Sequence, residues 1–292
     1  MQLKIADESC IRKLLGIYPS VQFRFDSRIH EAYIACMTKM FANKAYALME
    51  KEKPLGLIAY KELEWDSKHF GFPYAEISYI LGNCQLLLDS FEKWRKEHKI
   101  RFCSVKVSEK YIDIIHLLED NGFNLIEDAV TLYFSLKNGN FNKDYKLCKP
   151  EDIKQIGDIA FESFLNNRFH ADTNFDKQKV KERKRVWAVN ACNGYCDAVL
   201  TVYSDKKVAG FVACKIDREK NIGWIDLIAV DEHFRGKGYG MRLLESAKSY
   251  FYQKGCAYIC VTTQESNKVS MKMYLRSGFK ISHCNAILHK WF

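Results

Sequence analysis

The stretch VDEHFRGKGYG, Val230–Gly240, places three glycines on alternate positions between two apolar segments. A glycine inside a helix or a strand costs about 0.5–1 kcal/mol of stability, so three of them require a structural use. The preceding residues WIDLIAV alternate and predict a strand, whereas MRLLESAKSYFYQ, Met241–Gln253, has the apolar spacing of a helix. A glycine-rich loop between a strand and a helix N-terminus is typical of a phosphate site, because its N–H groups and the helix dipole attract an anion.

The spacing of the glycines distinguishes among the known phosphate-binding loops. A dinucleotide fingerprint requires GxGxxG, which Met241 breaks, and a P-loop requires Ser or Thr after the lysine, where Lys237 is followed by glycine. The run Arg235–Gly240 instead reads RxxGxG. It resembles the acyl-CoA pyrophosphate loop of the GCN5-related N-acetyltransferase (GNAT) superfamily, whose order of strand, loop, helix, strand and helix also follows here. A tight glycine turn without a ligand is the alternative.

This resemblance implies an acyl-CoA co-substrate, carrying an acetyl or a 3-hydroxybutanoyl group. Its pyrophosphate would lie on the loop, and its pantetheine arm in a slot where the strand AYICVTT, residues 257–263, splays from WIDLIAV. The residues expected to bind the donor are Ile228, Ala229, Val230, Arg235, Gly236, Lys237, Gly238, Tyr239, Gly240 and Asn267.

Asn267 and Tyr274 stand seven residues apart in QESNKVSMKMYLRSG and therefore share one face of a predicted helix. In the superfamily, a tyrosine at this place donates a proton to the departing thiolate, which makes Tyr274 the expected catalytic acid. The alternatives are an N-cap role for Asn267 and a core position for Tyr274.

The chain also repeats itself. KPLGLIAYK, residues 53–61, aligns without gaps on KVAGFVACK, residues 207–215. Further on, SVKVSEKYIDIIHLLEDNGF, residues 104–123, aligns without gaps on CVTTQESNKVSMKMYLRSGF, residues 260–279. Two matched blocks in the same order favour a duplication over a chance likeness of two α/β units.

The polar segment LKNGNFNKDYKL, residues 136–147, predicts a linker between the repeats. We therefore expect two tandem GNAT-like α/β domains, residues 1–140 and 145–292, each with a mixed, mostly antiparallel central sheet. The first half lacks the glycine loop and has Leu118 where the second has Tyr274. The N-terminal domain is therefore predicted to be degenerate and unable to bind CoA.

Outside the donor site, KELEWDSKHFGFP (residues 61–73), NRFHAD (residues 167–172) and the spaced pair Trp187 and Asn190 resemble signatures of the dTDP-fucosamine acetyltransferase family. This resemblance implies direct attack on the thioester by the amine of a dTDP-linked aminodideoxy sugar, in the biosynthesis of surface-polysaccharide sugars. The degenerate domain would form the acceptor side of a cleft. The residues expected to bind the acceptor are Arg168, His170, Asp172, Trp187, Asn190, Trp65 and Phe70.

Two residues are candidates for the catalytic base. His170 can take a proton from the sugar ammonium, with Asp172 orienting it, although the same motif can be a capping or packing cluster. Asp226 is the second candidate, although its place in an alternating strand also permits it to face solvent. The aromatic residues Trp65 and Phe70 can stack on a base or sugar, or form the domain interface.

Composition restricts the remaining classes. The 45 Lys and Arg and 36 Asp and Glu residues are spread along the chain without a basic tail, so we expect no nucleic acid partner. No signal peptide and no run of ~20 apolar residues is present, which predicts a cytoplasmic protein away from membranes. Eleven scattered cysteines predict free thiols and no metal. A homodimer is compatible with the sequence.

Two other functional classes remain open. The first is a GNAT enzyme whose acceptor amine belongs to a peptide, a polyamine or an antibiotic, which binding of dTDP would distinguish. The second is a non-enzymatic acyl-CoA sensor or a basic nucleic-acid binder. Tyr274 argues against the sensor, and a nucleic-acid binder would require a steep salt dependence of binding.

Overall fold

The computed structural model describes residues 2–7, 9–11, 13, 45–50, 53–82, 85–137, 139, 141, 144–165 and 167–292. The chain divides into two compact units: unit 1 contains residues 1–128 and 283–292, and unit 2 contains residues 129–282. The expected linker is described only in part, because residues 138, 140 and 142–143 lie outside the described residues.

Unit 2 contains a mixed sheet with the strand order β6-β11-β10-β9-β8-β7, in which only β10 and β11 are parallel neighbours. Its strands are β6 (Asn124–Ser135, in this unit from Ala129), β7 (Lys146–Leu147), β8 (Ala198–Ser204), β9 (Lys207–Asp217), β10 (Ile222–Val230) and β11 (Tyr258–Gln264). Its helices are α6 (Ile153–Ser163), α7 (Arg168–Ala171), α8 (Lys177–Asn190), α9 (Tyr239–Gln253) and α10 (Lys268–Arg276). Short 3-10 turns cover Pro150–Asp152 and Glu232–Phe234, and a π-helical turn covers Ala191–Tyr195.

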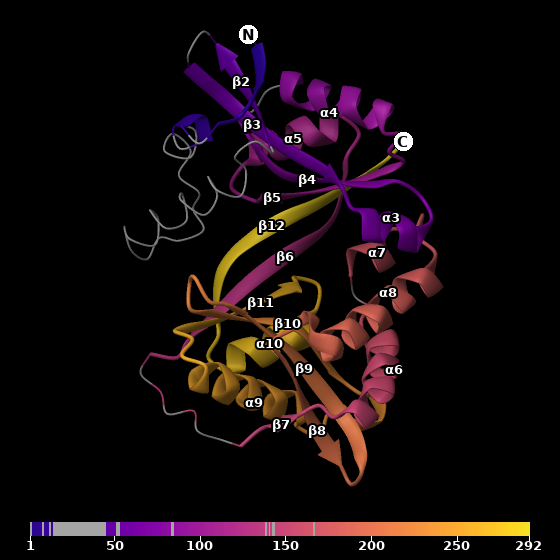
Figure 1. The fold of residues 1–292 in the computed structure, drawn as a ribbon, viewed down its shortest axis with the longest axis vertical. Coiled ribbons are helices and arrows are strands. Elements are labelled where there is room, and N and C mark those ends of the chain that lie inside the picture. Colours follow the sequence, from indigo (N-terminus) through magenta and orange to yellow (C-terminus); the bar gives the residue numbers. More distant parts are fainter. Residues whose placement is uncertain are drawn as a thin grey trace. The chain divides into compact units, whose positions relative to one another are not determined.

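The helices of unit 2 cover both faces of its sheet. Helices α6 and α8 lie side by side (Figure 1), and their apolar residues share a core with Phe211 and Ala213 of β9. Gly210, which precedes Phe211 in β9, faces α9. A β-carbon added at Gly210 would lie 3.0 Å from the side chain of Leu243 in α9. Because successive residues of a strand face opposite sides, α9 packs on the face opposite α6 and α8.

Unit 1 has a sheet of the same kind, with the strand order β1-β2-β3-β4-β5-β12 and one parallel pair, β4 and β5. Its main core lies between this sheet and the helices α4 and α5. Its strands are β1 (Gln2–Ile5), β2 (Tyr46–Glu50), β3 (Lys53–Glu62), β4 (Tyr74–Leu81), β5 (Phe102–Ser108) and β12 (Lys280–Trp291, in this unit from His283). Its helices include α3 (Glu64–Phe70), α4 (Gln85–Glu97) and α5 (Ile112–Asp120).

The two units exchange their last strands. In unit 2, residues Ala129–Ser135 of β6 pair with β11, although the part of the chain before Ala129 lies in unit 1. In unit 1, residues Asn285–Trp291 of β12 pair with β5. The compact units therefore differ from continuous domains with the boundaries 1–140 and 145–292. Both strands are 12 residues long and end equivalent halves of the repeat, so the local pattern does not distinguish their partners.

The repeat seen in the sequence is present in the strand register. In unit 1 the last parallel pair is Ile77 with Val105, and in unit 2 it is Ile225 with Val261. Each unit then has a register shift at the next residue, Ser78 in β4 or Asp226 in β10. The interval from Ile77 to Val105 is eight residues shorter than the interval from Ile225 to Val261. The glycine loop lies in the longer interval. The units therefore share one architecture, and unit 2 carries the insertion.

The strand exchange makes a prediction about Leu288, a fully buried residue of β12 in the core of unit 1. We expect Leu288→Ala to destabilise unit 1 by about 2–5 kcal/mol, because the cavity it leaves lies among α4 and α5 side chains. Hydrogen exchange should lose protection in β5 and keep it in β9 and β10. Ile281→Ala, in the same strand but 55% exposed, is the control. Equal loss of protection in both units would contradict the assignment of β12 to unit 1.

Candidate active site

The slot predicted between the two parallel strands is present in unit 2. Pairing between β10 and β11 ends at Ile225 and Val261, yet β10 continues to Val230 along β9, and β11 continues to Gln264 along β6. The predicted donor-binding residues Ile228–Val230 lie beyond the point where the strands part. On their β11 side, no strand among the described residues pairs with them, so their outward backbone groups are open to a ligand.

The glycine loop presents a row of unbonded amides. Gly236 and Gly238 have φ angles of 77° and 81°, in the left-handed region that glycine adopts without steric cost. Helix α9 begins at Tyr239 and receives no hydrogen bond from a capping side chain. Within the described part of the chain, none of the N–H groups from Gly236 to Met241 donates a hydrogen bond. This arrangement is a site for an anion, since the helix dipole adds to the six amides.

The third glycine has a different purpose. A β-carbon at Gly240 would lie 2.8 Å from the sulfur of Met273, which belongs to α10. The absence of a side chain at Gly240 therefore lets the first turn of α9 approach α10 closely. The alternate glycines combine two requirements: a left-handed backbone at two positions and a close helix contact at the third.

The two cations of the loop are exposed and hold its backbone. Arg235 donates from Nε to the carbonyl of Val230 at 3.2 Å and from Nη2 to Oγ of Ser163 at 3.3 Å. Lys237 donates from Nζ to the carbonyl of His233 at 3.2 Å. Both side chains therefore keep positive charge beside the unbonded amides while fixing the path of the loop.

Helix α10 carries Asn267 and Tyr274, as predicted. The Asn267 side chain caps the helix by accepting from the Ser270 N–H at 3.2 Å, so the N-cap role is present. Tyr274 is buried, and no described residue hydrogen-bonds its hydroxyl. Burial raises the pKa of the Tyr274 phenol well above its usual value, so it stays protonated at neutral pH.

Asp226 lies at the register shift that ends the parallel pairing. Its Oδ2 accepts from the indole Nε1 of Trp187 at 2.7 Å, which brings a predicted base and a predicted acceptor-binding residue together. The Cys196 sulfur lies 3.7 Å from the same oxygen, and burial, followed by the Asp226 charge, raises the pKa of this thiol to about 12. Asp226 is therefore held by two neutral donors at the mouth of the slot.

A row of stacked cations and rings extends from Trp187 on α8. The guanidinium of the buried Arg183 lies 4.9 Å from the ring centre of Trp187 and 4.9 Å from that of Phe169. The guanidinium of Arg168, a predicted acceptor-binding residue, lies 4.6 Å from the centre of the same Phe169 ring. The sequence reasoning missed Arg183, although its i, i+4 spacing to Trp187 on a helix places both on one face.

The predicted orientation of His170 by Asp172 stays a prediction. The Asp172 carboxylate accepts from the backbone N–H and the side-chain amide of Asn174, both at 3.0 Å, and so closes a turn. Nδ1 of His170 is buried without a hydrogen-bond partner among the described residues. The short helix α7 is capped by Asn167, so the RFHxD motif also has a capping role. Asn190 is exposed at the end of α8.

The two aromatic residues of unit 1 that were predicted to bind the acceptor, Trp65 and Phe70, differ in solvent exposure. Phe70 is 4% exposed and stacks on Phe72 with ring centres 5.9 Å apart, so it belongs to the interior. Trp65 is 45% exposed and lies parallel to the His69 ring at 5.2 Å. Of the two, Trp65 is the residue that can present a ring to a ligand.

Among the described residues, no group of three or more His, Cys, Asp or Glu side chains is arranged to hold a metal ion. The nine cysteines of this part of the chain are free thiols. No helix there is both long enough and apolar enough to span a membrane.

Comparisons with known proteins agree with this geometry. Residues 163–279 match the model of the acetyltransferase (GNAT) family, a segment that includes the slot, the loop and α10. This segment is a GNAT domain. The chain is 23% identical over 223 residues to the dTDP-fucosamine acetyltransferase of Escherichia coli O6:H1, covering 75% of this chain and 92% of that protein. The predicted superfamily and an acyl-transferring enzyme are thereby confirmed, and GNAT enzymes use acyl-CoA.

Solved GNAT structures share the fold. A GCN5-related N-acetyltransferase from Sphaerobacter thermophilus superposes with a TM-score of 0.68 at 12% identity, covering 99% of this chain and 95% of that one. A tandem GNAT protein from the clavulanic acid biosynthesis pathway superposes with a TM-score of 0.60 at 12% identity, covering 99% and 98%. The expected tandem GNAT fold with mixed sheets is thus confirmed.

The unbonded amides of the glycine loop lead to a prediction about the affinity for the acyl-CoA donor. We expect Gly238→Ala to weaken acetyl-CoA binding about tenfold, because a β-carbon there opposes the left-handed backbone and turns a charge-assisted amide away from the pyrophosphate. Calorimetric titration measures the effect. Gly255→Ala is a matched control, since Gly255 has a φ of 76° and also no atom within 4 Å of its β-carbon position. Equal affinity in both variants would exclude the loop as the pyrophosphate site.

Proposed function

We propose that the chain is an N-acyltransferase that moves an acetyl or 3-hydroxybutanoyl group from acyl-CoA to the amine of a dTDP-linked aminodideoxy sugar. The observation that carries the mechanism is the position of Asp226, at the residue where β10 and β11 part and beside Trp187. The likeness to the E. coli dTDP-fucosamine acetyltransferase, which extends over most of that protein, supports the acceptor class. Surface-polysaccharide sugar biosynthesis is the pathway class that would use this product.

The donor binds with its pyrophosphate on the unbonded amides of Gly236–Met241 and its pantetheine arm along the open edge of β10. Hydrogen bonds between this edge and the arm replace those that β11 no longer makes. A backbone N–H of the open edge donates to the thioester oxygen and stabilises the charge that develops there in the tetrahedral intermediate.

The neutral amine attacks the thioester carbon directly, and Asp226 accepts its proton, either directly or through one water molecule. As the intermediate collapses, the carbon–sulfur bond breaks and Tyr274 donates its phenolic proton to the leaving thiolate. Its burial keeps the phenol protonated until that moment. The thioester is already activated, so no covalent enzyme intermediate is required.

The acceptor side uses the cations near Trp187. Arg183 and Arg168 flank Phe169 and place two guanidinium groups in the same unit as Asp226. Guanidinium groups match the oxygens of a diphosphate in geometry and charge. His170, the other candidate base, lies on α7 and is proposed as an acceptor contact.

The substrate assignment is tested by the thermal stability of the protein with acetyl-CoA, dTDP and UDP, each alone and in pairs. A ligand at 100 times its dissociation constant adds about 2.7 kcal/mol of stability. We expect acetyl-CoA and dTDP each to stabilise the protein, and UDP to do so less. Stabilisation by acetyl-CoA without dTDP would reject the sugar nucleotide in favour of a peptide, polyamine or antibiotic amine. No response to either would reject the donor site as well.

The base is tested by Asp226→Asn. We expect kcat/KM for the amine to fall about 100-fold at neutral pH, because the amide cannot accept the proton. Asp205→Asn, at the exposed turn between β8 and β9, is the control, since asparagine tolerates the φ of 54° found there. A small effect of Asp226→Asn with a large effect of His170→Asn would transfer the role to His170.

A further inference from the structure

Lys248 on α9 is a buried cation that the proposed chemistry does not use. The residue is 5% exposed, and the other buried side chains of this helix are uncharged. Removing an ammonium group from water is costly unless it is paired and hydrogen-bonded inside the protein. Its retention at this position therefore requires compensating contacts, and these contacts lead to α10.

The ammonium group of Lys248 has three partners. Its Nζ donates to Oε1 of Glu245 at 2.9 Å and to the carbonyl of Ser277 at 2.9 Å, and it lies 4.3 Å from the ring centre of Phe134. Ser277 is the C-cap of α10, where helix carbonyls are left without intrahelical donors and carry partial negative charge. Lys248 therefore fixes the C-terminal end of α10 to the third turn of α9.

The same two helices meet at the first turn of α9. The hydroxyl of Ser277 donates to the carbonyl of Met273 at 2.8 Å and lies 3.2 Å from the sulfur of Met241. Met273 in turn occupies the space beside Gly240. The turn that presents the unbonded amides and the helix that carries Tyr274 are thus packed along one continuous seam, with Lys248 at its buried end.

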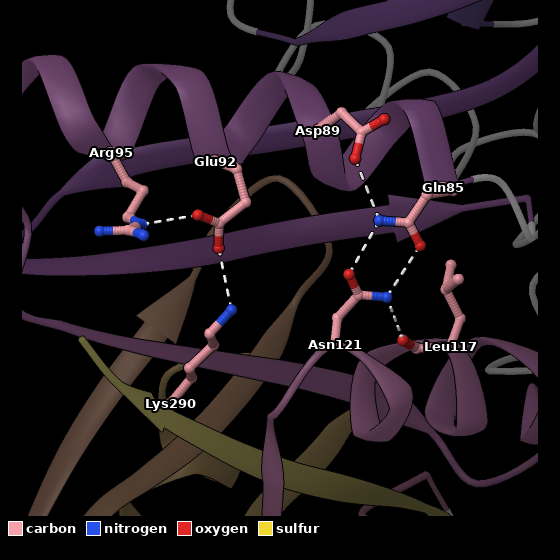
Figure 2. A network of polar contacts seen from close by, with 7 residues as sticks. All are labelled: Gln85, Asp89, Glu92, Arg95, Leu117, Asn121 and Lys290. Carbon is pink, nitrogen blue, oxygen red and sulfur yellow. Dashed lines mark hydrogen bonds and ion pairs between the residues drawn. The ribbon is translucent and has the colours of Figure 1, made fainter.

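Unit 1 provides an internal comparison, because its α4 and α5 correspond to α9 and α10. Leu87 and Leu243 pack against the equivalent glycines Gly56 and Gly210, and five residues after each stand Glu92 and Lys248. Figure 2 shows that Glu92 binds Lys290 and Arg95 and does not reach α5.

The helices of unit 1 are joined in a different way. The side-chain amides of Gln85 and Asn121 donate to each other at 2.8 and 2.9 Å (Figure 2), at the positions that Met241 and Ser277 hold in unit 2. Stable packing of this helix pair is therefore possible without a buried lysine on the C-cap carbonyl. The lysine occurs in the unit that has Tyr274, whereas Leu118 takes that place in unit 1.

We propose that Lys248 is a positioning residue for acyl transfer: by tying the C-terminal end of α10 to α9, it holds the Tyr274 hydroxyl against the sulfur of a donor whose pyrophosphate is bound at α9. This inference rests on the proposed function. Lys248 is expected to affect acyl transfer and not donor binding, because the unbonded amides of the glycine loop lie at the other end of the contact between α9 and α10.

The test compares Lys248→Met, Lys248→Arg and Tyr274→Phe, with Lys254→Met as a control at the exposed end of α9. A displacement of about 1 Å in a catalytic group can reduce a rate by about 100-fold. We expect Lys248→Met to lower kcat about tenfold with the KM and dissociation constant for acetyl-CoA unchanged within twofold, and Lys248→Arg to restore most of the rate. Lys254→Met should leave all three constants unchanged.

A double-mutant cycle separates positioning from general stability. If Lys248 acts through Tyr274, Lys248→Met should cost little further rate in the Tyr274→Phe background. Losses that multiply, or a rise in KM with unchanged kcat, would overturn the proposal. Should Lys248→Met not fold, Glu245→Gln tests the same contact, and an unchanged kcat in Glu245→Gln would also overturn the proposal.

A structural readout keeps this test independent of the acceptor. In protein labelled with ¹³C at the tyrosine ζ carbon and saturated with CoA, the Tyr274 resonance is assigned by its absence in Tyr274→Phe. We expect Lys248→Met to shift this resonance and Lys254→Met to leave it in place. An unshifted resonance rejects the positioning role. A shifted resonance in a protein that transfers no acyl group to any amine would instead retain the contact and reject the proposed function.

Discussion

The end of parallel pairing at Ile225 and Val261 is the constraint on which the site depends. Up to this pair, the backbone groups of β10 are bonded on both sides, and no ligand can enter. Beyond it, the register shift at Asp226 lets β10 follow β9 while β11 follows β6. The same local change opens an edge for the pantetheine arm and directs a carboxylate toward Trp187. Register shifts of this kind re-aim side chains and end pairing next to active sites.

The two units have the same architecture and differ in the residues proposed for donor binding and catalysis. Unit 1 keeps the parting strands and the equivalent register shift at Ser78. It lacks the eight-residue insertion that holds the glycines, and its helix pair is joined through Gln85 and Asn121. Unit 1 thus has the parted pair of strands without the glycine loop. The inserted loop supplies what the strands cannot, a row of amides without internal partners at the start of a helix.

The helix pair after the slot shows that catalytic and structural contacts are continuous. Gly240, Met273 and Ser277 form a seam that also contains the buried charge of Lys248. Such a charge would weaken the domain if its partners were removed, which explains why it is bonded to both a carboxylate and a helix carbonyl. Rigid support of this kind is what a proton donor requires, because small displacements reduce its contribution to the rate.

The sequence by itself determined the superfamily, the repeat, and the strand and helix on either side of the loop. These features depend on local periodicity and on glycine, whose backbone freedom follows from the residue type alone. Only the tertiary structure decided that β6 and β12 are exchanged, that Asp226 meets Trp187 and that Arg183 and Lys248 are buried. Each of these depends on contacts between residues far apart in the chain. Strands of equal length and similar pattern, and cations that look exposed in a helical sequence, give no local indication of the partner that long-range packing selects.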